Sequence, residues 1–137
     1  MTLKKLPIGI QSFSTVRQDD FIYIDKTEMV HQLASTQGRF FLSRPRRFGK
    51  SMLISTFHDL FEGKKSLFEG LYIYDKWDWN TTYPVIRIDF AGASIRNQAD
   101  LNHSVLLILK YHQEQFAIAC EEKNAVDFIS LIIFQKR

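Results

Sequence analysis

The chain has 137 residues, of which 45% are hydrophobic and twelve are phenylalanine, so it is long enough for one globular domain with its own core. Its one cysteine, Cys120, excludes an intrachain disulfide and a zinc site built from several thiolates. The net charge is a modest +3. No segment has the pattern of a signal peptide or the ~18 apolar residues of a membrane helix, and we therefore expect a cytoplasmic protein without a membrane partner.

Residues 1–38 predict an irregular lead-in, a short extended element at 21–24 and then a helix. Asp25 is the expected cap of this helix, because Glu28 three residues later completes a capping box. The expected buried stripe of the helix consists of Met29, Val30, Leu33 and Ala34. Asp25 and Lys26 could instead be a catalytic pair, but a cap followed by a solvated lysine is the favoured interpretation.

Residues 39–63 predict a buried strand, a phosphate-binding loop and a helix. The apolar run at 40–42 is typical of a strand that is covered on both faces. Helical period begins at Lys50, with one apolar stripe made of Leu53, Phe57, Leu60 and Phe61. The loop at 44–51 reads RPRRFGKS. It matches the P-loop pattern G-x-x-x-x-G-K-[ST] except that Arg44 stands where the first glycine is usual.

The residue types of this loop suit a nucleoside triphosphate. Backbone N–H groups at the start of a helix hold phosphates, because unpaired donors and the positive end of the helix dipole coincide there. Gly49 would let the backbone approach the phosphates, Lys50 would be the catalytic residue that reaches them, and Ser51 would ligate the metal ion. The expected nucleotide-binding residues are Arg46, Arg47, Phe48, Gly49, Lys50, Ser51 and Met52. The predicted cofactors are ATP and Mg²⁺.

The same stretch carries a cluster of basic residues with no acidic residue among them. This basic cluster consists of Arg39, Arg44, Arg46, Arg47 and Lys50. Such a cluster favours polyanions, with nucleotide phosphate as the first candidate and nucleic acid as the second. A basic surface turn without a ligand is the remaining interpretation. The apolar segment before the loop and the amphipathic helix after it favour the nucleotide.

Residues 64–137 predict a connector, a strand, a long helix and a final strand. The aromatic run at 72–79 could stack bases, but its charges are mainly acidic, so a loop packed onto the domain is favoured. The second strand is expected at 85–90, the long helix at about 98–122 and the last strand at 128–134.

The histidines of the chain do not predict a metal site. His112 lies on the apolar stripe of the long helix, where a lone histidine is usually a packed core residue. Neither His58 nor His103 has a sequence-local partner that would complete a ligand set.

Five blocks of the chain resemble the bacterial AAA-ATPase-like family. They are LPIGIQSF at 6–13, YIDKT at 23–27, FLSRPRRFGKS at 41–51, LFEGLYI at 67–73 and YPVIRIDF at 83–90. The resemblance thins beyond Asn97. It implies a P-loop ATPase domain in which Arg44 is the usual residue, followed in typical members by a nuclease-like domain of the PD-(D/E)XK type, and hence nucleic acid as a partner of the full-length proteins. One hypothesis is that the YIDKT block lies against the adenine or ribose.

The resemblance and the predicted elements together imply an α/β fold, with residues 1–137 forming part of a P-loop NTPase whose parallel sheet is flanked by helices. In the family a later strand ends in adjacent acidic residues that hold Mg²⁺, so Asp89 comes too early to be that ligand. Here the last predicted strand runs into Gln135, Lys136 and Arg137. We therefore expect a chain truncated before the acidic strand, as a fragment, a frame-shifted remnant or a split product. An uncovered sheet edge would favour self-association.

Three functions stay open. The first is ATP binding with weak or absent hydrolysis, because no carboxylate completes the Mg²⁺ shell or positions the attacking water. The second is a nucleic-acid or polyanion-binding module that uses the basic cluster. The third is a non-functional remnant, which predicts poorly cooperative unfolding and no stabilisation by ligands.

Overall fold

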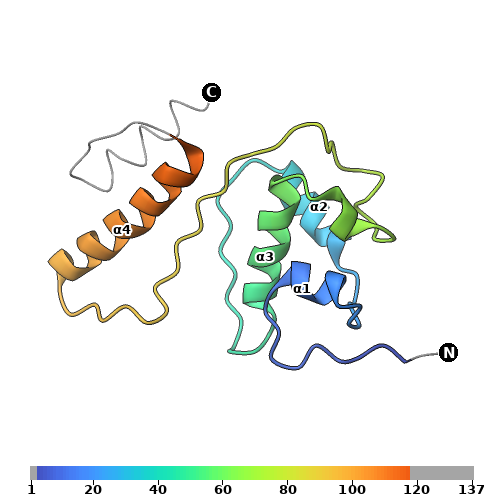
Figure 1. Cartoon of the computed structure of the whole chain (residues 1–137), viewed down its shortest axis with the longest axis horizontal. Helices are drawn as coiled ribbons and strands as arrows, with labels where there is room; N and C mark the ends of the chain where they lie inside the picture. The colour runs from blue at the N-terminus through green and yellow to red at the C-terminus, as the bar shows by residue number, and fades with distance from the viewer. Residues whose placement is uncertain (1–2, 118–137) are drawn as a thin grey trace. The chain divides into compact units, whose positions relative to one another are not determined.

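The computed structural model describes residues 3–117, and the regular structure there is helical (Figure 1). The helices are α1 at Phe13–Gln18, α2 at Thr27–Ser35, α3 at Lys50–Phe61, the 3-10 helix η1 at Lys65–Phe68, and α4 at Gln98–Phe116. The chain divides into two compact units, Met1–Val85 and Ile86–Arg137. Within the described residues, none of the helices combines the length and the apolar character that crossing a membrane requires.

The predicted parallel sheet is wrong for the part of the chain that the structure describes. Between residues 3 and 117 the extended pairing is limited to an isolated parallel bridge between Lys5 and Phe21. The segments at 40–42 and 85–90 form no strand, and the predicted strand at 128–134 lies outside the described residues. A β-strand is stable only where another extended segment pairs with its backbone N–H and C=O groups. An apolar run predicts burial but cannot supply that neighbour.

The side chains expected inside this sheet are exposed. The exposed fractions are 58% for Phe40, 92% for Phe41 and 47% for Leu42. In Figure 1 this segment runs as an extended chain from the end of α2 to the turn that starts α3. The predicted self-association is untested, and within 3–117 it has no sheet edge to use.

The core of the first unit is built by its helices and by the connector that follows α3. Its buried residues are Phe13, Val30, Leu60, Leu67, Phe68 and Ile73. Tyr74, Trp77 and Trp79 pack against this core. The indole N–H of Trp79 also donates to the Tyr74 carbonyl at 2.7 Å. The prediction that the aromatic run is a loop packed onto the domain is confirmed.

Helix α2 begins two residues after its predicted cap. The Asp25 carboxylate accepts from the Thr27 N–H at 2.8 Å and from the Thr27 hydroxyl at 2.6 Å. Lys26, the residue immediately before the helix, makes no capping bond with its side chain. Val30 is buried as predicted, whereas Met29 is 61% exposed. Asp25 therefore accepts from a backbone N–H of the first helical turn, although it lies one residue before the N-cap position.

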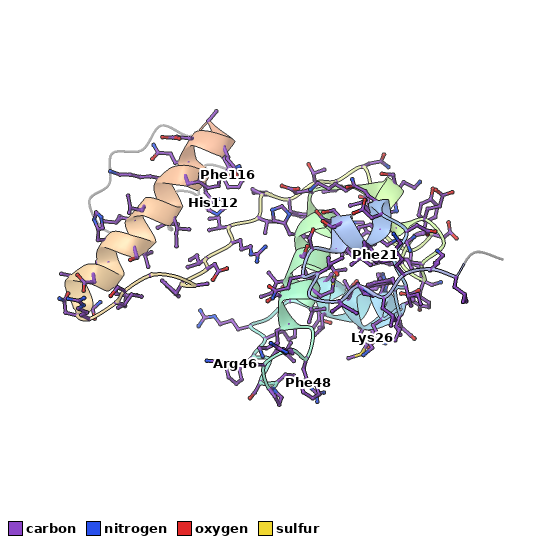
Figure 2. All side chains as sticks on the ribbon, turned by 60° about the horizontal axis from the view of Figure 1, so that its bottom comes forward. Phe21, Lys26, Arg46, Phe48, His112 and Phe116 are labelled. Carbon is purple, nitrogen blue, oxygen red and sulfur yellow. The ribbon has the colours of Figure 1, made fainter. Side chains whose placement is uncertain are left out.

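Helix α4 is the described helix of the second unit. It starts at Gln98 as predicted, and the Asn97 side chain caps it. Leu109 and His112 are buried on the predicted stripe. The imidazole Nε2 of His112 lies 3.2 Å from the N–H and 3.1 Å from the carbonyl oxygen of Arg87, and the ring stacks on Phe116 (Figure 2). The packed role predicted for this histidine is confirmed.

Candidate phosphate-binding site

Helix α3 begins at Lys50, directly after Gly49, as predicted. The Leu53 N–H donates to the Gly49 carbonyl at 2.9 Å, so the helical hydrogen bonds start at that glycine. Gly49 occupies the N-cap position and has no side chain, so no side chain caps the helix. The N–H groups of Lys50, Ser51 and Met52 thus have no acceptor within α3. The helix start presents donors that an anion can satisfy.

The loop before α3 has the backbone geometry of an anion-binding concavity. Arg47 has φ 66° and Gly49 has φ 77°, whereas Phe48 between them does not have a positive φ. Alternation of this kind makes a nest, in which successive N–H groups point into one hollow. A Cβ added to Gly49 would meet no atom within 4 Å. The space beside this backbone is therefore open to a ligand, and glycine is the residue that its conformation favours.

The side chain of Lys50 lies across the loop. Its ammonium group donates to the carbonyl oxygens of Arg44 at 2.6 Å and of Pro45 at 2.7 Å. These acceptors are neutral, and a phosphate oxygen is a stronger acceptor for an ammonium group because it is charged. The amine is held within the loop by bonds that a phosphate group can replace.

A pocket of about 780 Å³ lies at the start of α3. From the loop and the helix it is lined by Arg46, Arg47, Gly49, Lys50, Ser51 and Met52. Six of the seven residues predicted to bind the nucleotide therefore share one pocket. The seventh, Phe48, is not among the lining residues, and its side chain is 67% exposed. Figure 2 labels Arg46 and Phe48 on the loop itself.

The same pocket fits a magnesium ion only in part. Ser51 is half-buried and lines the pocket, so its hydroxyl is available as one oxygen ligand. Among the described residues that line the pocket there is no aspartate or glutamate. Further ligands for Mg²⁺ would have to come from phosphate oxygens and water.

The second wall of the pocket was missed by the sequence analysis. It is formed by Pro7, Ile8, Gly9, Ile10 and Gln11. These residues lie in the segment predicted as an irregular lead-in. The turn residues Pro7 and Gly9 in an apolar stretch were the local signal for an ordered turn. No local signal shows that this turn faces the phosphate-binding loop, because the contact joins residues about forty positions apart.

The YIDKT block makes hydrogen bonds to the connector that follows α3. The Asp25 carboxylate accepts from the Tyr72 N–H at 2.7 Å, and the Thr27 hydroxyl accepts from the Ile73 N–H at 3.2 Å. None of the residues at 23–27 lines the pocket. The structure gives the block a role in fastening α2 to the connector, and the hypothesised contact with adenine or ribose finds no support in it.

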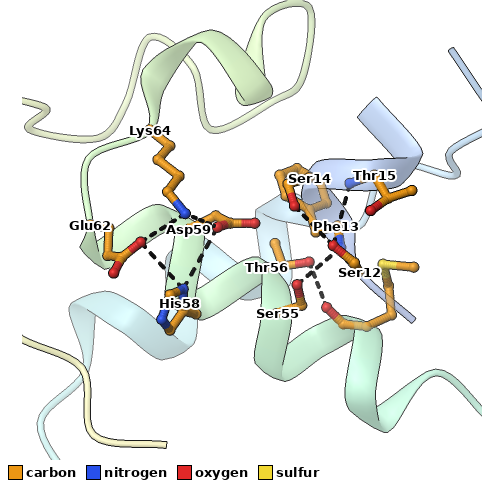
Figure 3. Close-up of polar contacts among 11 residues, drawn as sticks. Ser12, Phe13, Ser14, Thr15, Ser55, Thr56, His58, Asp59, Glu62 and Lys64 are labelled. Carbon is orange, nitrogen blue, oxygen red and sulfur yellow. Dashed lines mark hydrogen bonds and ion pairs between the residues drawn. The ribbon is translucent and has the colours of Figure 1, made fainter. Parts of the chain in front are cut away.

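His58 has carboxylate neighbours, contrary to the sequence analysis. Its Nδ1 lies 3.7 Å from Asp59 Oδ1 and 3.4 Å from Glu62 Oε2 (Figure 3). The ligand atoms of these three residues lie within 4.8 Å of one another, as in a metal site. However, the Lys64 ammonium lies 2.8 Å from each of the two carboxylates. Lys64 thus supplies one positive charge to a group that contains two carboxylates.

The two carboxylates favour the charged form of Lys64. Partial burial works to lower the pKa of Lys64, but its hydrogen bonds to Asp59 and Glu62 outweigh burial and raise the pKa. Asp59 is buried, so its charge requires such a partner. We interpret the group as a structural ion cluster near the end of α3.

Comparison with known proteins adds to this geometry. A protein described as "Uncharacterized protein in vnfD 5'region" from Azotobacter chroococcum mcd 1 is 45% identical over 134 residues, which are 96% of this chain and 26% of that protein. The chain therefore spans about a quarter of the length of this relative. No solved structure matches this chain. The family described as "Predicted AAA-ATPase" matches residues 7–136, which extends well beyond Asn97, where the resemblance was expected to thin. The chain belongs to the AAA-ATPase-like family.

Proposed function

We propose that the chain binds a nucleoside triphosphate together with Mg²⁺, with ATP as the nucleotide, through residues 46–52. The observation that carries this proposal is the uncapped start of α3, which borders the pocket beside the Lys50 side chain. The left-handed Gly49, with open space beside it, supports the same conclusion. Membership of the AAA-ATPase-like family supports ATP as the nucleotide.

The residues of the pocket divide the work of binding. The N–H groups of Lys50, Ser51 and Met52 satisfy phosphate oxygens, because the helix leaves them without acceptors. The Lys50 ammonium exchanges the carbonyl groups of Arg44 and Pro45 for the β and γ phosphates. Arg46 and Arg47 line the pocket and add positive charge. Mg²⁺, when bound, neutralises phosphate charge, and the Ser51 hydroxyl is the protein ligand for it.

We infer that hydrolysis by this chain is weak or absent. Turnover requires a group that positions or activates the attacking water and a carboxylate that helps to hold Mg²⁺. The described residues that line the pocket include no such carboxylate. For the longer proteins of the family we propose the same binding step, with nucleic acid as a partner of any nuclease-like domain.

The proposal is tested by thermal unfolding with Mg-ATP, Mg-ADP and short DNA. A ligand that binds only the folded state stabilises it by about 2.7 kcal/mol at a hundred times the dissociation constant. We expect this stabilisation with Mg-nucleotide in the wild type and none in Lys50→Ala. The matched control is Lys26→Ala, which removes an exposed lysine outside the pocket and is expected to respond as the wild type does. Equal stabilisation of Lys50→Ala by Mg-ATP would refute the proposal.

Polyanion binding through the basic cluster is the second candidate, because its four arginines are all exposed. The members concerned are Arg39, Arg44, Arg46 and Arg47. This function predicts that DNA stabilises the chain as well as ATP does and that binding falls steeply with salt. It also predicts that Lys50→Ala only partly weakens DNA binding, because this substitution removes one of the five positive charges of the basic cluster. A chain without a cooperative transition would favour the third alternative, a non-functional remnant.

A further inference from the structure

An apolar turn lies opposite the phosphate-binding residues. Ile8 lines the pocket and is nevertheless 86% exposed. The Ile10 N–H donates to the Pro7 carbonyl at 3.4 Å, and Gly9 between them has φ 75°, as the third residue of a type II turn requires. The turn is thus ordered, yet it holds a large apolar side chain in water. Packing within the unit gives no reason for that exposure.

The turn is anchored at both ends. On its C-terminal side the buried Phe13 donates its N–H to the Ser55 hydroxyl of α3 at 3.0 Å (Figure 3). Ser55 lies one helical turn beyond Ser51, so this bond ties the segment to the helix that carries the pocket. On its N-terminal side the Lys5 carbonyl accepts from the Ile22 N–H at 2.9 Å. A segment held in this way is already arranged for a ligand, which lowers the entropic cost of binding.

The two walls of the pocket differ in chemistry. The wall at 46–52 offers N–H donors and positive charge, which suit phosphates. The wall at 7–11 offers apolar side chains from Pro7, Ile8 and Ile10. Gln11 adds an amide that carries both a donor and an acceptor. A base has an apolar face and a polar edge, so this second wall suits the nucleoside and not the triphosphate.

We propose that the turn at 7–11 binds the nucleoside part of the nucleotide, with the base packed against Ile8 and Ile10 and its polar edge at Gln11. The inference rests on the proposed function, because the phosphates must occupy the loop for the base to reach the turn. The pocket volume of about 780 Å³ lies within the range typical of small-molecule sites.

The test compares Mg-ATP with Mg-tripolyphosphate, which has the phosphates but no nucleoside, by calorimetric titration of the full chain. Ile8→Ala is expected to weaken Mg-ATP about tenfold, because it removes most of an apolar side chain that the base would cover. It should leave the affinity for tripolyphosphate unchanged. Ile24→Ala is the matched control, since Ile24 is 74% exposed and does not line the pocket, and it should change neither affinity.

A second variant keeps the test independent of one substitution. Gln11→Ala also replaces an exposed residue of the turn, and it should again weaken Mg-ATP selectively. If both variants weaken the two ligands equally, or neither, the nucleoside site is refuted while phosphate binding stands. If the wild type binds neither ligand, or Lys50→Ala binds both as the wild type does, the proposed function fails and the nucleoside site with it.

Discussion

The Asp25 carboxylate accepts a 2.7 Å hydrogen bond from the backbone N–H of Tyr72, a residue 47 positions further along the chain. Next to it the Thr27 hydroxyl accepts from the Ile73 N–H. Arg17 contributes two more bonds to the same region, from its guanidinium to backbone carbonyls of the connector at 2.8 and 2.6 Å. The sequence blocks YIDKT and LFEGLYI are therefore joined by hydrogen bonds. Polar side chains hold the connector in place, because within residues 3–117 it does not pair with another segment through a backbone ladder.

Removal of the Asp25 carboxylate should destabilise the first unit. Asp25→Ala leaves the N–H groups of Thr27 and Tyr72 without their acceptor, and we expect a loss of about 2 kcal/mol. Urea denaturation measures this loss as a lower midpoint at an unchanged slope. Asp78→Ala is the control, because within residues 3–117 the Asp78 carboxylate bonds to residues two and three positions away, and its effect should be smaller. Equal losses in the two variants would contradict this role of Asp25.

The ionisation of Asp25 should make the stability of the protein depend on acidic pH. Partial burial is the largest influence and works to raise the pKa of Asp25. The hydrogen bonds from Thr27 and Tyr72, with the nearby charge of Arg17, together outweigh it and lower the pKa below its usual 3.8. A carboxylate whose pKa falls on folding stabilises the folded state above its unfolded pKa. That contribution is lost as the pH falls through the folded value.

The expected result is that the wild type loses stability below about pH 4 more steeply than Asp25→Asn, which has no proton to take up at this position. Urea midpoints measured from neutral pH into this acidic range compare the two proteins. The pKa of Asp78 is also lowered, by its own hydrogen bonds to Thr81 and Asn80, but Asp78 is present in both proteins. Parallel pH profiles would show that Asp25 does not titrate differently in the folded state.

The bond between α1 and α3 should matter for both stability and binding. Ser55→Ala leaves the buried N–H of Phe13 without an acceptor, which should cost about 1 to 3 kcal/mol. It also frees one anchor of the turn at 7–11, so Mg-ATP should bind more weakly. Ser14→Ala is the matched control, because the bond of the Ser14 hydroxyl, among the residues that the structure describes, is to the nearby Ser12 hydroxyl. Chemical denaturation measures the stability, and calorimetry measures the affinity for Mg-ATP. Wild-type values of both in Ser55→Ala would show that the bond between Phe13 and Ser55 does not have this role.

Substitution of Phe41 distinguishes the helical structure from the predicted buried strand. Phe41 is 92% exposed, so Phe41→Ser should change the free energy of unfolding by less than about 0.5 kcal/mol. Phe68 is fully buried and contacts the rings of Phe13 and Trp79, so Phe68→Ala should cost about 3 to 5 kcal/mol. Denaturant titration of both variants measures these values. A loss in Phe41→Ser as large as that in Phe68→Ala would show that this residue is buried after all.

The strands that were predicted and do not form have one physical cause. Apolar runs at 40–42 and 85–90 predicted strands, but a strand needs a second extended segment to pair with. Within 3–117 neither run pairs with such a segment. For the apolar runs, the neighbouring segment that a strand requires is not local in the sequence. The partners of His58, by contrast, are local, because Asp59 and Glu62 follow it by one and four positions, and side chains four positions apart on a helix are neighbours.

The sequence by itself determined the features that depend on adjacent residues. These include the start of α3 at Lys50 after Gly49, the start of α4 at Gln98, and the family. They are local because a helix start needs only its own cap and the residues of its first turn. Tertiary structure alone decided that the turn at 7–11 faces this loop and that Asp25 reaches Tyr72. Such contacts depend on how the whole core packs, which no short stretch of sequence specifies.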